Sequence, residues 1–217
     1  MTSARGGDLA LIDAGGANLG SVRYALARIG ATPRLVRDAD ELGTPERILL
    51  PGVGAAAPSM ALLRTRGLDA ALRASQAPLL GVCVGMQLLF ERSEEGDVEC
   101  LGLLAGCVRR LPAGSGLRIP HMGWNTLRRR PGLEGDAAAL LDGIDDGAHA
   151  YFVHSYAVLA DAAAATGSGG TTLAFSEHGV SFAAVVGQGR RFGAQFHPER
   201  SSAVGLRLLS NFLSLPA

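Results

Sequence analysis

A cysteine flanked by small residues is the strongest chemical signal in the sequence. Gly81-Val82-Cys83-Val84-Gly85 lies between a short apolar run and a stretch with helical periodicity. This spacing is typical of a nucleophile elbow, a strained strand-to-helix turn that exposes its central residue, with Cys in place of the usual Ser. The partial positive charge of a following helix N-terminus favours the thiolate form of such a cysteine. A buried structural cysteine at a strand end is the competing interpretation, and this pentapeptide alone does not decide between them.

A histidine and a glutamate that could activate this cysteine occur near the C-terminus. Gln195-Phe196-His197-Pro198-Glu199 follows the last predicted strand. His197 therefore lies where a parallel strand ends, which is the edge at which ligands bind in open α/β sheets. Because Pro198 prevents the strand from continuing, His197 and Glu199 can turn towards each other, as a base and its orienting group must. Taken alone, the segment is better interpreted as a loop histidine beside a surface glutamate, and only its combination with the cysteine elbow favours catalysis.

Donors for a developing oxyanion are predicted at a third strand end. Leu50-Pro51-Gly52-Val53-Gly54 follows an apolar run, and its glycines allow peptide N–H groups to point into a pocket. The N–H of Val84, directly after the cysteine, is the second natural donor. An ordinary Gly-Pro turn is the alternative for this segment in isolation. In combination, the three segments indicate acyl transfer by a cysteine nucleophile.

The elements needed to position these segments form an α/β pattern. Short apolar runs alternate with amphipathic stretches in the first half, which predicts a mostly parallel sheet covered by helices. Strands are expected at Leu9–Asp13, Arg34–Arg37, Arg47–Leu50 and Pro78–Val82, and helices at Asn18–Ile29, Met60–Leu72 and Val84–Glu91. From about Cys107 the chain becomes β-rich, with strands expected at Cys107–Leu111, Asn125–Arg128, His149–Val153, Thr172–Ser176, Phe182–Val186 and Phe192–Phe196, and a closing helix at Ser201–Leu213. We predict one domain over residues 1–217, with a flexible N-terminus (1–7) and a mobile loop (161–170).

Composition excludes several classes of function. The 217 residues carry a formal net charge of zero, which offers no electrostatic footprint for nucleic acid or an anionic membrane. All 20 basic residues are Arg, so a Schiff-base lysine, a P-loop lysine and a Ser–Lys nucleophile are excluded. The three cysteines fit neither a disulfide framework nor a structural zinc site. No signal peptide or membrane-length apolar run is visible, and a cytoplasmic location is expected.

The three segments together resemble the triad-type class I glutamine amidotransferases. Three further segments are similar to signatures of one family in that class, the glutaminase subunit of imidazole glycerol phosphate synthase in histidine biosynthesis: Asp13–Leu19, Pro120–Asn125 and Tyr151–Tyr156. The resemblance extends from Leu9 to the C-terminal helix. It implies a single flavodoxin-like α/β domain with a central, mostly parallel sheet and a β-rich C-terminal half.

The resemblance also implies an activity and a set of site residues. The activity is hydrolysis of L-glutamine to L-glutamate and ammonia, with no metal and no organic cofactor. The catalytic residues are the nucleophile Cys83, the general base and acid His197, and its orienting residue Glu199. The oxyanion hole and the glutamine pocket are implied at Gly52, Val53, Val84, Gln87, His154, Ser155 and Tyr156, where Gly52 permits a peptide flip.

A partner subunit is implied as well. In this family it is a (βα)₈-barrel cyclase that forms a heterodimer with the glutaminase and uses its ammonia to make imidazole glycerol phosphate and aminoimidazole carboxamide ribonucleotide. The residues implied to face it are Asn18, Met122, Trp124, Tyr151 and Arg200. The chain departs from the family at Ala14, where Tyr is usual, and at Arg200, where Lys is usual. Arg keeps the charge of Lys but not its shape, and both departures lie towards the implied partner interface.

Three alternatives stay open at this point. A class I amidotransferase subunit of another synthase would carry the same triad, and only the signature segments argue against it. A cysteine peptidase or related hydrolase on a similar fold would use the same elbow, but does not explain the combined Val-His-Ser-Tyr and His-Pro-Glu segments. A non-catalytic binding subunit is disfavoured by the intact set of Cys83, His197 and Glu199.

Overall fold

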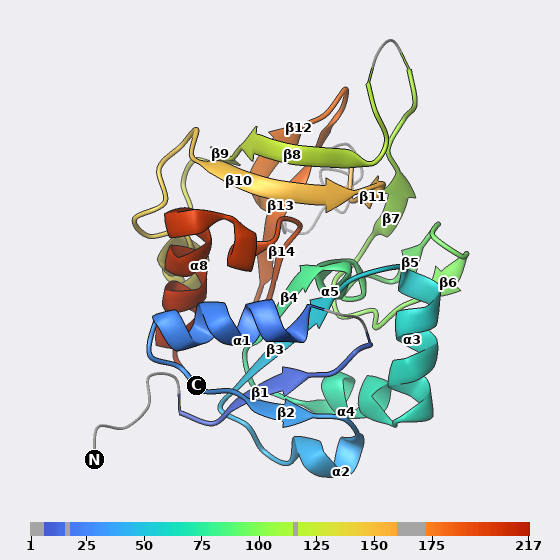
Figure 1. Cartoon of the computed structure of the whole chain (residues 1–217), viewed down its shortest axis with the longest axis vertical. Coiled ribbons are helices and arrows are strands. Elements are labelled where there is room, and N and C mark those ends of the chain that lie inside the picture. Colours follow the sequence, from blue (N-terminus) through green and yellow to red (C-terminus); the bar gives the residue numbers. More distant parts are fainter. Residues whose placement is uncertain (1–6, 16–17, 115–116, 160–171) are drawn as a thin grey trace.

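The main sheet runs through the whole molecule and carries the elements that hold the candidate site. The computed structural model describes residues 7–15, 18–114, 117–159 and 172–217 (Figure 1). Its main sheet is eight-stranded, in the order β2 (Arg34–Val36), β1 (Leu9–Ile12), β3 (Arg47–Gly52), β4 (Leu79–Cys83), β14 (Arg191–Ala194), β13 (Ser181–Gln188), β12 (Thr172–Glu177) and β9 (Arg128–Arg129). The strands from β2 to β14 pair in parallel, and those from β14 to β9 pair antiparallel. Parallel pairing brings the carboxyl ends of β3, β4 and β14 to one edge.

Two smaller sheets accompany the main one. The first is an antiparallel pair of β8 (His121–Thr126) and β10 (His149–His154), and the second has the order β11 (Tyr156–Ala157), β7 (Cys107–Arg110), β5 (Arg92–Ser93) and β6 (Val98–Glu99). The β8–β10 pair is joined to the main sheet by aromatic packing. The Phe152 ring of β10 lies 5.6 Å from that of Phe182 in β13 and 5.8 Å from that of Phe196, centroid to centroid. These edge contacts fix β10 against the end of β14.

Helices flank the parallel part of the main sheet. They are α1 (Leu19–Arg28), α2 (Ala39–Leu42), α3 (Ala56–Thr65), α4 (Leu68–Ala74), α5 (Val84–Gln87), α6 (Gly135–Leu140), a 3₁₀ turn η1 (Pro198–Arg200) and α8 (Ser202–Ser214). Figure 1 shows α1 and α8 together on one side and α3 with α4 on the other. Val22, Ala25 and Leu26 of α1 are buried at helical spacing, as expected of an amphipathic helix. No helix in the described part of the chain combines the length and apolarity needed to cross a membrane.

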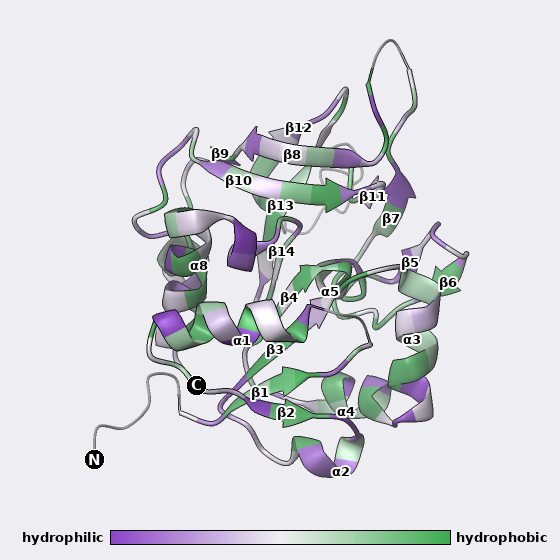
Figure 2. Cartoon of the chain, in the orientation of Figure 1, coloured by the Kyte–Doolittle hydropathy of each residue, from purple (hydrophilic) through white to green (hydrophobic). Residues whose placement is uncertain are grey.

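The central strands form the core. Every residue of β1, β3 and β4 is buried, which explains why these strands read as continuous apolar runs and not as alternating ones. Figure 2 shows the same strands and α5 as hydrophobic ribbon in the interior. The site is thus built on the most buried part of the fold.

The predicted α/β class and mostly parallel sheet are confirmed, but several element bounds are wrong. The helix expected over Met60–Leu72 is two helices, α3 and α4, because Gly67 lies between them with a φ of 66°. The helix expected over Val84–Glu91 ends at Gln87. The strand expected to stop before Pro51 continues to Gly52. Proline has no backbone N–H to donate, but pairing of β3 with β1 has already ended at Leu49. Pro51 therefore costs no hydrogen bond between these two strands.

Some elements were not predicted at all. The expected strand over Asn125–Arg128 is divided between β8 and β9, which belong to different sheets, and Leu127 is buried between them. The short elements α2, β5, β6, β11 and α6 lack a visible periodicity because they span only two to six residues. The expected loop over 161–170 and the expected flexible N-terminus lie outside the described residues, apart from Gly7.

Candidate active site

Cys83 occupies a strained turn between β4 and α5. Its φ of 54° and ψ of −114° lie in a region that residues with a Cβ rarely adopt, which stores strain of order 1–3 kcal/mol. The neighbouring glycines make the turn possible. A Cβ on Gly81 would lie 2.5 Å from the Gly85 carbonyl oxygen, and one on Gly52 would lie 2.5 Å from the Gly85 nitrogen. The small residues around Cys83 therefore allow β3, β4 and α5 to meet closely enough to present the thiol.

Replacing Gly85 by alanine is expected to prevent stable folding. The new Cβ would lie 1.8 Å from the Leu50 carbonyl oxygen of β3, a backbone atom that cannot move aside easily. We expect a loss of unfolding free energy of at least about 3 kcal/mol in chemical denaturation, or no soluble protein. Gly20→Ala in α1 is the matched control, since nothing lies within 4 Å of its new Cβ. That variant should gain up to about 1 kcal/mol of stability. Denaturation of G85A at the wild-type midpoint would contradict this packing.

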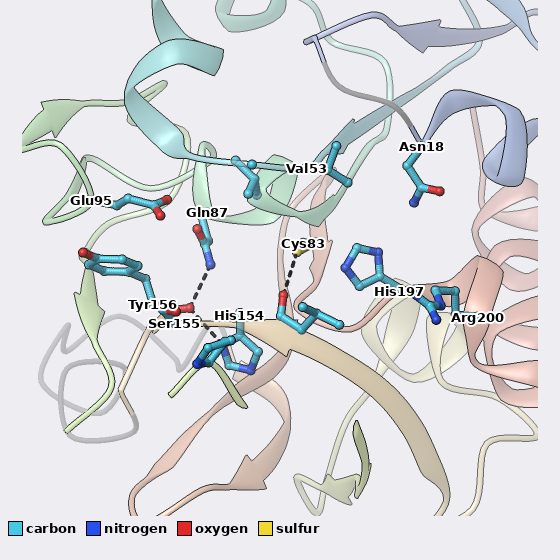
Figure 3. Close-up of a pocket in the computed structure, with 14 residues that line it drawn as sticks. Asn18, Val53, Cys83, Gln87, Glu95, His154, Ser155, Tyr156, His197 and Arg200 are labelled. Atoms are coloured by element: carbon cyan, nitrogen blue, oxygen red, sulfur yellow. Dashed lines mark hydrogen bonds between the residues drawn. The ribbon is translucent and has the colours of Figure 1, made fainter. Parts of the chain in front are cut away.

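His197 lies beside Cys83 at the same sheet edge. Strand β14 pairs with β4 through Ala194 and Val82, so the chain leaving β14 reaches His197 next to the elbow. The His197 backbone N–H donates to the Tyr151 carbonyl at 2.9 Å, and the Ser201 hydroxyl donates to the His197 carbonyl at 2.7 Å. These bonds hold the ring so that it faces the Cys83 sulfur across the pocket (Figure 3).

Glu199 orients the His197 ring from the opposite side. The η1 turn brings its carboxylate back to His197, and Nδ1 of His197 donates to Oε1 of Glu199 at 2.8 Å. The Asn18 side-chain amide donates to the same oxygen. The side chains of His197 and Glu199 are only 9% and 1% exposed, so solvent screens this pair weakly. With Nδ1 committed to Glu199, Nε2 is left to serve Cys83.

The charges in this group are strongly coupled. Burial alone lowers the pKa of His197, but its hydrogen bonds to Cys83 and Glu199 and their negative charges outweigh burial and raise the pKa to about 10. Burial raises the pKa of Glu199, but His197 and Asn18 outweigh it and the net pKa falls. An imidazolium paired with the Glu199 carboxylate is therefore the favoured state at neutral pH.

A pocket of about 380 Å³ opens over Cys83 and His197. Figure 3 shows it extending from Glu95 at one end, past Cys83, to Asn18 and Arg200 at the other. Val53 and Val84 line it next to Cys83, where the sequence predicts oxyanion donors. Gly52 lies behind this wall, as the last residue of β3. In its thiol form Cys83 points to the Val153 carbonyl, 3.8 Å from Sγ.

The residues expected to hold glutamine lie together on the pocket wall, and the ring of one of them, His154, is already fully hydrogen-bonded within the protein. Gln87, Ser155 and Tyr156 line the pocket with His154. Both ring nitrogens of His154 are already engaged, Nε2 with His121 at 3.0 Å and Nδ1 with the Tyr156 carbonyl at 2.9 Å. Its ring therefore has no polar atom left to offer to a ligand.

Two residues close to the catalytic group were missed by sequence reasoning. Glu95 lines the pocket and caps α3 by accepting from the Ala56 N–H at 2.9 Å, and burial raises its pKa although this bond opposes the shift. Gln195 is fully buried behind Cys83, where its Oε1 accepts from Gln87 at 3.0 Å and its Nε2 lies 3.9 Å from the sulfur. Glu95 stands in a Glu-Glu run with no motif. Gln195 precedes His197 by two residues, and that was the only available signal.

The residues expected to face a partner form a cluster at the pocket mouth. Met122 and Trp124 of β8 are 64% and 54% exposed. The Trp124 ring contacts the Tyr151 ring edge-on at 5.9 Å, and the Arg200 guanidinium lies 4.4 Å above the Tyr151 ring. Asn18 and Arg200 also line the pocket, so this exposed cluster is continuous with the cavity over Cys83. Ala14, which departs from the resemblance, is buried.

Comparison with known proteins shows the family to which the chain belongs. The model of the family "Glutamine amidotransferase class-I" matches residues 10–215. The chain is 57% identical to imidazole glycerol phosphate synthase subunit HisH of Xanthomonas euvesicatoria pv. vesicatoria, over 96% of this chain and 98% of that protein. It is 56% identical to the HisH subunit of Xylella fastidiosa strain Temecula1, over 97% and 98% of the two chains.

Solved structures agree on the fold. A crystal structure of a glutamine amidotransferase superimposes with a TM-score of 0.72 at 22% identity, covering 95% of this chain and 97% of that one. PurLQS from Thermotoga maritima superimposes with a TM-score of 0.66 at 19% identity, covering 95% and 98%. The chain belongs to the class-I glutamine amidotransferases and, within them, to the HisH subunits of imidazole glycerol phosphate synthase.

Proposed function

We propose that the protein is the glutaminase subunit of imidazole glycerol phosphate synthase, and that Cys83, His197 and Glu199 are its catalytic triad. The observation that carries this proposal is the arrangement of the three side chains: the His197 ring faces the Cys83 sulfur and is held by Glu199 at 2.8 Å, all at the edge of one pocket. A nucleophile, a base and a group that orients the base are the components of covalent acyl transfer.

The polar groups of the pocket suit the free amino acid glutamine. Oε1 of Gln87 is buried and has no hydrogen-bond partner among the described residues, because its Nε2 is turned inward to Tyr156 and Gln195. With the nearby Glu95 carboxylate, it offers two acceptors at the end of the pocket away from His197. Such acceptors complement an α-ammonium group. Burial disfavours the charged form of Glu95, and a cation bound beside it would favour that form.

The first half of the reaction forms a thioester. The Cys83 thiolate attacks the side-chain carbonyl carbon of glutamine, and the oxyanion that forms accepts hydrogen bonds from backbone N–H groups near Val53 and Val84. The His197 imidazolium then gives its Nε2 proton to the amide nitrogen, which leaves as ammonia when the C–N bond breaks. His197 is neutral at this stage.

The second half releases glutamate. Neutral His197 takes a proton from a water molecule whose oxygen attacks the thioester carbonyl, and the tetrahedral intermediate collapses with loss of the Cys83 thiolate. The product carboxylic acid ionises in solvent, and the resting pair of thiolate and imidazolium is restored. His197 thus carries out both proton transfers that take place within the site.

The exposed cluster of Met122, Trp124, Tyr151 and Arg200 supports a partner on this face. Interfaces are enriched in Trp, Tyr, Met and Arg, and this cluster contains all four next to the pocket mouth. We infer that a (βα)₈-barrel cyclase binds here as a heterodimer and receives the ammonia, which it uses to make imidazole glycerol phosphate and aminoimidazole carboxamide ribonucleotide. The three cysteines are free, in keeping with the cytoplasmic location that we propose.

The direct test is glutamate release from L-glutamine by the purified chain, alone and with the barrel cyclase and its ribonucleotide substrate. We expect weak hydrolysis alone and a strong rise with the liganded partner. Stimulation by a different synthase would assign the chain to another amidotransferase. Turnover of peptides without glutaminase activity would favour a cysteine hydrolase, and absence of both would indicate a binding subunit.

Truncating Trp124 to alanine is expected to weaken binding of the cyclase by about 30-fold or more, as removal of a central aromatic anchor usually does. Trp124 lies outside the pocket over Cys83, so hydrolysis by the isolated chain should not change. Titration calorimetry with the purified cyclase measures the effect. Tyr24→Ala is the matched control, because Tyr24 is 71% exposed but belongs to α1, outside the predicted interface. Equal losses for both variants would place the interface elsewhere.

A further inference from the structure

Three histidines, of which His121 and His154 are buried, form a group beside the glutamine pocket that the proposed mechanism does not use. His121 of β8 stands directly opposite His154 of β10. The His121 ring is stacked between those of Phe152 and His178, with centroid distances of 5.1 Å and 4.3 Å. Within the described residues, no set of three or more His, Cys, Asp or Glu side chains could hold a metal ion. The group therefore has another role than metal binding.

The hydrogen bonds of His121 and His154 can run in only one direction. The Tyr156 carbonyl can only accept, so Nδ1 of His154, 2.9 Å away, must carry the proton. In a neutral ring, Nε2 of His154 then accepts from Nδ1 of His121 at 3.0 Å. Nε2 of His121 in turn accepts from the Asn125 amide at 3.2 Å. Both histidines are thereby assigned to the Nδ1–H tautomer.

The residue that begins this hydrogen-bond chain, Asn125, uses its whole side-chain amide in hydrogen bonds. The Asn125 amide nitrogen gives its other proton to the Glu177 carbonyl at 2.7 Å, and the Asn125 oxygen accepts from the Thr126 N–H at 2.8 Å. Burial lowers the pKa of His121 to about 4, assisted by the charge of His178, and burial lowers the pKa of His154 to about 3. Both rings are neutral at pH 7, as the one-directional chain requires.

The hydrogen-bond chain ends at the Tyr156 carbonyl oxygen, which also orients Gln87. The Tyr156 carbonyl accepts from Nδ1 of His154 and also from Nε2 of Gln87, the latter at 2.8 Å. Holding Nε2 inward leaves Oε1 of Gln87, a residue of the pocket wall, as a buried acceptor without a partner among the described residues. Any shift of the Tyr156 carbonyl therefore moves the group to which we assign the substrate ammonium.

We propose that His121 is a positioning residue of the glutamine pocket, acting through His154 on the Tyr156 carbonyl and hence on Gln87. The inference deepens the proposed function and rests on it. His121 does not line the cavity, so its effect on substrate is indirect. It lies on the inner face of β8, whose outer face presents Met122 and Trp124, because side chains alternate along a strand. The same strand therefore serves the pocket and the exposed cluster.

The test uses variants that separate the hydrogen bond from the packing. H121F keeps a ring between Phe152 and His178 but removes both polar nitrogens. H121L also removes both nitrogens and leaves a smaller, non-aromatic side chain. H121N retains a hydrogen-bond donor near the position of Nδ1. We expect H121F and H121L to raise the KM for glutamine about five- to tenfold with little change in kcat, the effect of one lost buried hydrogen bond. H121N should restore the KM. Ser176→Ala, another buried polar position, in β12, is the matched control and should not change it.

A readout besides turnover separates this inference from the proposed function. Alkylation of Cys83 by iodoacetamide needs no amino-acid recognition, whereas labelling by a diazoketone analogue of glutamine does. H121F and H121L should slow only the analogue, so slowing of both reagents alike would overturn the inference. If wild-type protein hydrolysed no glutamine, the proposed function would fail, while the analogue series would still decide the role of His121.

The tautomers can be observed directly. Long-range ¹H–¹⁵N correlation spectra of the wild-type protein at pH 7 should show His121 and His154 as neutral rings protonated at Nδ1. An Nε2–H tautomer or a charged ring at either position would break the chain and overturn the inference, as would an unchanged KM in H121F and H121L. An H121N variant as impaired as H121L would reduce His121 to a packing role.

Discussion

Replacement of Cys83 by alanine is expected to lower kcat for glutamine hydrolysis by at least about 10⁴-fold, because loss of the nucleophile removes the covalent route altogether. The fold should survive the change. Cys83 adopts a φ of 54°, which strains alanine no more than cysteine, and the glycines that permit the turn remain. Glutamate release by purified C83A, with thermal unfolding as a check on folding, measures the effect.

The other two cysteines provide the control for this prediction. Burial raises the pKa of Cys100 to about 11 and also raises that of Cys107, so both are protonated thiols at pH 7 and react slowly with iodoacetamide. Alkylation at pH 7 should therefore reach Cys83 first and stop hydrolysis in step with its modification. Cys107→Ser should retain full activity. A kcat of C83A close to that of the wild-type protein would remove Cys83 as the nucleophile.

The positions of Cys83 and His197 could be predicted from the sequence because Cys83 ends a strand with a visible apolar signal and His197 lies three residues beyond the end of another. Parallel strands end at the same edge, so the carboxyl ends of β4 and β14 had to bring the two segments together. The catalytic roles of both residues stay predictions until the variants are measured. The position of Glu199 could be predicted as well, because it lies only two residues beyond His197.

Glu95 and Gln195 illustrate what local patterns cannot provide. Glu95 reaches the pocket from the turn between β5 and β6, elements of two residues each that carry no periodicity. The role of Gln195 depends on Gln87, 108 positions away in the chain, and on the packing of β14 against α5. The hydrogen-bond chain through His121 is similar, since it requires the register of β8 against β10. Tertiary packing decides such contacts.

Replacement of Glu199 by glutamine is expected to lower kcat about 10²- to 10⁴-fold with little effect on KM, as loss of charge on the orienting group of a triad does. The geometry should be retained. Both His197 and Asn18 donate to the same oxygen, Oε1, and the amide oxygen of glutamine can take that place. The change then removes the negative charge beside the imidazolium and leaves its orientation.

The pH dependence of E199Q distinguishes loss of charge from loss of structure. His197 must be protonated to give a proton to the leaving ammonia, and it loses that proton as the pH rises through its pKa of about 10. Glu199 is one of the two groups that raise this pKa, so its neutralisation lowers the pKa and moves the alkaline fall in kcat to lower pH. Glu177→Gln, at an exposed position of β12, should leave both rate and profile unchanged. If kcat of E199Q were lower but fell at the same alkaline pH as in the wild-type protein, Glu199 would act only by orienting the His197 ring. In that case the charge on this carboxylate would not be what holds the proton on His197.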